Sequence, residues 1–136
     1  MEALLARCGY DSKDRTRNWH PGWMKDREAC VAFVRGAYAR KDASQGMESI
    51  VWLPEAETIA EMGCTHEGLG EACRWAAFKA LTMYAGLTES GQHAEDWAEA
   101  VRRYLDRGCK LGNKEACAIL ASGVDSRGRE YPVHGH

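Results

Sequence analysis

Six cysteines are the residues with the most evident chemistry in this chain of 136 residues. A thiol can pair in a disulfide, ligate a metal or, once deprotonated, act as a nucleophile. No Cys-x2-Cys pair is present, so the spacing does not favour zinc, and paired thiols would offer no thiolate for catalysis. Disulfides and reduced core thiols both remain possible roles for Cys8, Cys30, Cys64, Cys73, Cys109 and Cys117.

The familiar catalytic signatures are missing. The sequence has no Ser-x-x-Lys, His-Glu-x-x-His or Gly-x-Ser-x-Gly motif and no phosphate-binding glycine loop. His66 and Glu67 begin like a metalloprotease pair, but Gly68 and Gly70 interrupt the helix and no second histidine follows. We therefore expect no catalytic residue, no cofactor and no metal site.

Charge is balanced overall but segregated along the chain. The formal net charge of -2 and pI near 6.2 argue against nucleic acid as a partner, because phosphate binding needs a basic excess. Residues 47–101 hold two basic and ten acidic side chains, whereas both flanking segments are basic. The acidic middle is either a solvated face or a patch for a basic partner, and its candidate binding residues are Glu55, Glu57, Glu61, Glu95, Asp96 and Glu99.

The stretch YDSKDRTRNWHPGWMKD, residues 10–26, is the most unusual in the chain. It gathers Trp, His and Arg side chains, and Trp and Arg are frequent anchors of protein interfaces. The alternative is that the tryptophans fold back and cap the end of the first helix. The candidate partner-binding residues here are Arg15, Arg17, Trp19, His20 and Trp23.

Three Glu-Ala-Cys stretches reveal an internal repeat. They end at Cys30, Cys73 and Cys117, 43 and 44 residues apart, and each is followed by apolar residues at +3 and +4. This spacing marks one face of an α-helix. The sequence predicts a short helix up to Cys8, an irregular loop over residues 9–25, and helices near 26–42, 53–65, 70–85, 93–110 and 113–122.

The repeat also predicts how the cysteines pair. One cysteine of each pair lies near the end of a helix and the next lies near the start of the following helix, with a short turn between them. An antiparallel arrangement would bring these thiols together. The register favours Cys8 with Cys30, Cys64 with Cys73, and Cys109 with Cys117, among the fifteen pairings that six cysteines allow.

The segment EACRWAAFKALTMYAGLTESGQHAEDWAEAVRRYLDRGCKLGNKEAC resembles a Sel1-like repeat, a helix-pair unit related to tetratricopeptide repeats. The paired cysteines make it most similar to the cysteine-rich branch of that family. The resemblance implies an all-α fold: a short α/α solenoid of about two and a half repeats with disulfides between adjacent helices. We expect one domain over residues 1–123 and a flexible tail over 124–136.

The resemblance implies a non-catalytic protein-protein interaction module, such as a small inhibitor or immunity-type protein that binds a toxin or enzyme. The alternative is a β-lactam or cell-wall-peptide hydrolase, because some cysteine-rich members of the family resemble penicillin-binding proteins in activity. The expected partner is another protein or peptide, with no nucleic acid and no membrane span. Similar bacterial proteins include periplasmic and secreted ones. We expect such a location here if the cysteines are paired, and a cytoplasmic location otherwise.

Overall fold

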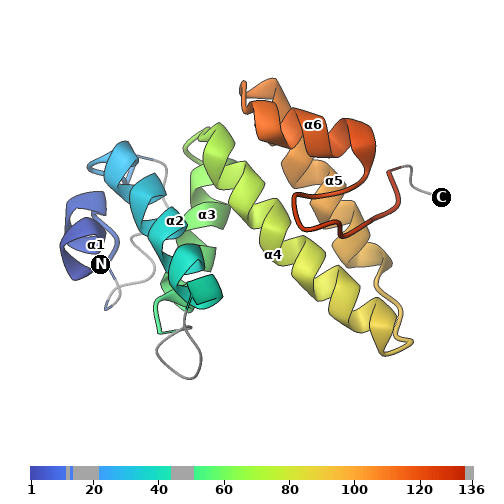
Figure 1. The fold of residues 1–136 in the computed structure, drawn as a ribbon. Coiled ribbons are helices and arrows are strands. Elements are labelled where there is room, and N and C mark those ends of the chain that lie inside the picture. The colour runs from blue at the N-terminus through green and yellow to red at the C-terminus, as the bar shows by residue number, and fades with distance from the viewer. Residues whose placement is uncertain (12, 14–21, 44–50, 134–136) are drawn as a thin grey trace. The chain divides into compact units, whose positions relative to one another are not determined.

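The computed structural model describes residues 1–11, 13, 22–43 and 51–133, and six α-helices joined by turns and loops make up most of these ranges (Figure 1). They hold no strand beyond an isolated antiparallel bridge between Val124 and Glu130. The predicted all-α class is therefore confirmed. The helices are α1 (Glu2–Cys8), α2 (Arg27–Ala43), α3 (Leu53–Thr65), α4 (Gly70–Glu89), α5 (Glu95–Lys110) and α6 (Lys114–Ser122).

The helix α4 runs further than the sequence predicts. Gly86 was expected to follow the helix but lies within it, and the chain leaves the helix at Ser90 and turns at Gly91, whose φ is +76°. One glycine in a helix costs only about 1 kcal/mol, which the packing of a long helix offsets. The turn requires a positive φ, which glycine adopts without strain.

The contacts within the chain divide it into two compact units, Met1–Gly68 and Leu69–His136. In unit 1, α2 packs against both α1 and α3. Phe33, on α2, is fully buried, and its ring meets the ring of Trp52 edge-on with centroids 5.9 Å apart. The other buried core residues of this unit include Val34, Ala37, Tyr38, Ile59 and Ala60.

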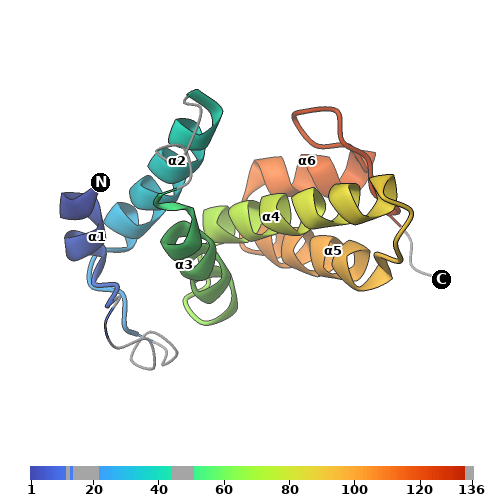
Figure 2. The ribbon, with the colours of Figure 1, turned by 90° about the horizontal axis from the view of Figure 1, so that it is seen from below.

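In unit 2, α4 and α5 form an antiparallel pair, and α6 packs against both (Figures 1 and 2). Small side chains allow this close packing, because alanine lets neighbouring helices approach. The apolar core consists of Ala77, Ala80, Leu81, Ala100, Val101, Leu105, Ala116 and Tyr131.

Part of the predicted flexible tail belongs to this core. Tyr131 is 5% exposed, and its hydroxyl donates to the carbonyl of Ile119 on α6. Asp125 accepts from the backbone N–H groups of Arg127 and Arg129, which closes a turn. Apolar Tyr131 and the Asp125 turn thus hold this part of the chain against the helices. Residues 134–136 lie outside the described residues.

The cysteines are disulfide-bonded, as the repeat predicts. Cys8 pairs with Cys30, and Cys109 pairs with Cys117. Cys64 and Cys73 are the remaining two disulfide-bonded cysteines, and no described cysteine is free. The alternative of reduced core thiols is therefore excluded by the structure.

Candidate interaction site

The tryptophan-containing loop contributes one described candidate. Trp23 is 6% exposed, and its ring packs edge-on against Tyr10 with centroids 5.9 Å apart. A side chain buried this deeply fits the capping role and offers no surface anchor for a partner. The other four candidates of this loop, Arg15, Arg17, Trp19 and His20, lie outside the described residues.

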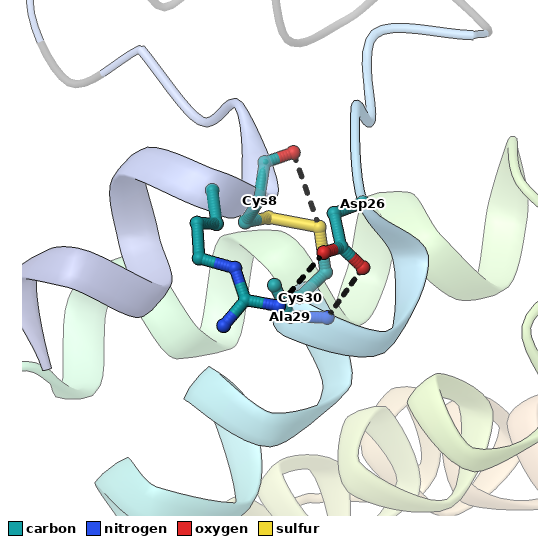
Figure 3. Close-up of a disulfide and its surroundings, with 5 residues drawn as sticks. Cys8, Asp26, Ala29 and Cys30 are labelled. Atoms are coloured by element: carbon teal, nitrogen blue, oxygen red, sulfur yellow. Dashed lines mark hydrogen bonds and ion pairs between the residues drawn. A yellow bond between two sulfur atoms is a disulfide. The ribbon is translucent and has the colours of Figure 1, made fainter.

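A disulfide and an N-terminal helix cap fix the chain beside this loop (Figure 3). Cys8 and Cys30 are fully buried, and the backbone N–H of Lys25 donates to the Cys8 carbonyl. Asp26 accepts a hydrogen bond from the Ala29 backbone N–H and forms an ion pair with Arg7 at 3.1 Å. The disulfide, the hydrogen bonds and the ion pair together hold the end of α1 against the start of α2, so we assign these contacts a structural role.

The electrostatics of Asp26 follow from the same contacts. The hydrogen bond from the Ala29 N–H lowers the pKa of Asp26, burial opposes this effect, and the Arg7 guanidinium lowers the pKa further. A carboxylate at the start of a helix is stabilised in its charged form, because unpaired backbone N–H groups point toward it.

The acidic residues of α3 only partly face solvent. Glu61 is exposed, whereas Glu55 and Glu57 are half-buried. Burial raises the pKa of the Tyr38 hydroxyl, and the negative charge of Glu57 raises it further. Glu57 therefore acts on the interior of unit 1, which leaves Glu61 as the most accessible of the three carboxylates.

The acidic residues of α5 lie at the start of that helix. Asp96 and Glu99 are exposed, and Glu95 pairs with Arg102 at 3.0 Å. The stretch from Ala80 to Val101 contains no lysine or arginine. Within residues 80–101, the end of α4 and the start of α5 therefore carry carboxylates and no lysine or arginine.

The structure adds a groove at the same end of unit 2, between α4 and the C-terminal segment. Its volume is about 590 Å³, and Glu89 and Glu130 are exposed on its walls. The residues that line it are Tyr84, Ala85, Thr88, Glu89, Glu130, Tyr131 and Pro132. We call it the acidic groove.

Sequence reasoning missed the acidic groove because one wall comes from the predicted tail. Arg102 holds that wall in place by donating to the Pro132 carbonyl at 2.8 Å while it also pairs with Glu95. The one available signal was the apolar Tyr131 in a polar segment, because an isolated aromatic residue can mark chain that returns to a core.

A second, apolar pocket in unit 2 has a volume of only about 20 Å³. This is about the space that one water molecule needs. The described part of the chain has no cluster of three or more His, Cys, Asp or Glu side chains placed to hold a metal ion. The walls of the small apolar pocket include Arg74, Phe78, Glu115, Ile119 and Asp125.

Fold and site together define a helical, disulfide-bonded protein with an acidic groove at one end of its second unit. Comparison with protein-family models, with curated proteins and with solved structures finds no match. Among the helices of the described ranges, none is both long and apolar enough to cross a membrane.

Proposed function

We propose that this chain is a non-catalytic protein-interaction module, and that the acidic groove binds a basic segment of a partner protein. The observation that carries the proposal is a groove whose exposed carboxylates form no ion pair in the part of the chain that the structure describes. Glu89 and Glu130 line the groove, and neither has an ion pair among the described residues. Tyr84 supplies an aromatic ring beside these carboxylates.

This combination suits a lysine or arginine side chain. The ammonium or guanidinium group would meet the two carboxylates, and the aliphatic stem would lie along the apolar wall. A cation can also gain from the face of a tyrosine ring. The acidic residues at the start of α5 would steer a basic partner toward the groove and raise the association rate more than the affinity.

We further propose that the helices form Sel1-like repeats and that the module acts as a small inhibitor or immunity-type protein. The 43- and 44-residue spacing of the Glu-Ala-Cys stretches and the helix pairs that follow them support the repeat. Three disulfides are compatible with an oxidising compartment. A periplasmic or secreted location is therefore part of the proposal.

A peptide titration followed by NMR tests the binding site. The probe is a short acetylated peptide with alternating arginine and glycine, and its control replaces arginine with glutamine. We expect saturable shifts at the backbone amides of Thr88, Glu89 and Glu130 with the basic peptide alone. High salt should weaken binding, because solvent-exposed charge pairs are screened.

Two variants make the titration specific. Glu89→Gln with Glu130→Gln should weaken binding about tenfold, because each exposed charge pair contributes modestly. Glu2→Gln with Glu28→Gln removes two exposed carboxylates from unit 1 and should leave binding unchanged. Equal weakening by both variants would show an effect of net charge and would refute the groove as the site.

The non-catalytic part of the proposal has its own test. The protein should not hydrolyse nitrocefin at micromolar concentration. Turnover that a single polar substitution abolishes would instead favour the hydrolase alternative.

A further inference from the structure

The disulfides differ in their access to solvent. Cys8 and Cys30 are fully buried, and so are Cys64 and Cys73. Cys109 and Cys117, at the turn between α5 and α6, are both partly exposed. Exchange requires an external thiolate to reach a sulfur atom in line with the disulfide bond, so burial protects a disulfide and exposure opens it to attack.

Hydrogen bonds also hold the turn that carries Cys109 and Cys117. Gly112, at φ +92°, lets the chain reverse, and its N–H donates to the Cys109 carbonyl at 3.0 Å. The Asn113 N–H donates to the Gly108 carbonyl at 2.9 Å, and the Asn113 side chain caps α6 by accepting from the Ala116 N–H at 2.8 Å. These bonds would keep the two thiols adjacent after reduction.

Two lysines lie close in sequence to this disulfide, and Glu115 lies in the same first turn of α6 as Cys117. Lys110 follows Cys109 directly, and Lys114 begins α6 three residues before Cys117. Lys110 pairs with Asp106 at 2.8 Å, whereas Lys114 is exposed. Cys117 also lies in the first turn of α6, where the helix dipole stabilises negative charge. A positively charged group near a cysteine stabilises the thiolate that leaves during exchange.

We propose that Cys109–Cys117 is a reversible thiol-disulfide exchange site for external thiols, whereas Cys8–Cys30 is a permanent structural cross-link. A thiolate of a low-molecular-weight dithiol attacks the Cys109 sulfur and forms a mixed disulfide, and Cys117 leaves as the thiolate. The second thiol of the reagent then displaces Cys109 and becomes a cyclic disulfide. The protein gains two electrons and two protons, and the reagent loses them.

The preserved turn makes the reverse reaction favourable. When oxidised glutathione forms a mixed disulfide with one of the two cysteines, the other is adjacent and closes the ring by displacing glutathione. Tyr131 also holds α6 through the hydrogen bond of its hydroxyl to the Ile119 carbonyl. The site can therefore cycle without unfolding unit 2.

Timed alkylation of the full chain tests this proposal. The folded protein is exposed to dithiothreitol, samples are quenched with N-ethylmaleimide, and each cysteine is quantified by peptide mass spectrometry. We expect Cys109 and Cys117 to be labelled at least about tenfold faster than Cys8 and Cys30. Far-ultraviolet circular dichroism should stay unchanged during this first phase, and oxidised glutathione should restore the disulfide.

Variants separate access from charge. Lys110→Gln with Lys114→Gln should slow reduction about twofold to fivefold through the weaker stabilisation of the leaving thiolate. Lys13→Gln with Lys41→Gln removes the same charge from unit 1 and should leave the rate unchanged. Equal labelling of the Cys8 and Cys109 pairs, earlier labelling of Cys8 and Cys30, or loss of helical signal in step with the first labelling would overturn the proposal.

Discussion

Replacement of Gly108 by alanine probes the closest helix approach in unit 2. Gly108 lies in α5, and a β-carbon there would lie 3.0 Å from the β-carbon of Cys73 and 3.1 Å from that of Ala116. It would also lie 3.2 Å from the backbone oxygen of Gly70. Real β-carbons rarely approach other atoms this closely, so α4 or α6 would have to move.

Two opposing effects determine the size of the change. Alanine is favoured over glycine in a helix by about 0.5–1 kcal/mol. Overpacking a well-packed core costs about 1–3 kcal/mol. The atoms that Gly108 would meet are β-carbons and backbone, which cannot rotate away as the end of a flexible side chain can. We therefore expect Gly108→Ala to lower the free energy of unfolding by about 1–2 kcal/mol.

Urea unfolding followed by circular dichroism measures this change. Gly86→Ala is the matched control, because Gly86 also lies within a helix but a β-carbon there would meet nothing within 4 Å. This control should raise the free energy of unfolding by about 0.5–1 kcal/mol. A Gly108→Ala protein as stable as the Gly86→Ala protein would show that the close approach of the helices has been misjudged.

Three further predictions follow from single contacts. Tyr131→Phe should cost about 0.5–1 kcal/mol, because it removes the hydroxyl that donates to the Ile119 carbonyl, while that carbonyl still accepts from the Gly123 backbone N–H. Tyr131→Ala should cost about 3–5 kcal/mol in urea unfolding, and equal stability of the wild type and the alanine variant would contradict the packed C-terminal segment. Replacing both Cys8 and Cys30 by alanine should cost about 3 kcal/mol, because their separation of 22 residues closes a loop in the unfolded chain, and an unchanged thermal midpoint would rule out this contribution. Folding lowers the pKa of Asp26, so the contribution of this carboxylate to stability is present above the unfolded pKa and is lost as pH falls through the folded pKa. The difference in free energy of unfolding between the wild type and Asp26→Asn should therefore shrink from about pH 6 to about pH 3. A difference that grew in acid would contradict the assigned contacts.

The amino-acid sequence by itself determined where the helices lie and which cysteines pair within each unit. Both features depend on the spacing of residues along the sequence. Apolar residues at helical spacing specify a helix, and Asn113 with Gly112 specifies the turn that brings Cys109 to Cys117. Because the repeat places a cysteine at equivalent positions, its register predicted the pairing of Cys8 with Cys30 as well.

Only the tertiary structure decided which of these residues face solvent. Tryptophan is a residue type that often anchors interfaces, yet Trp23 is buried and its ring packs against Tyr10. This burial depends on the path of the chain in three dimensions. Glu130 belongs to a segment whose composition predicts a flexible tail, and it lines a groove because Tyr131 is buried in a core built from α4, α5 and α6. Contacts between segments far apart in sequence leave no periodic pattern, so periodicity cannot reveal them.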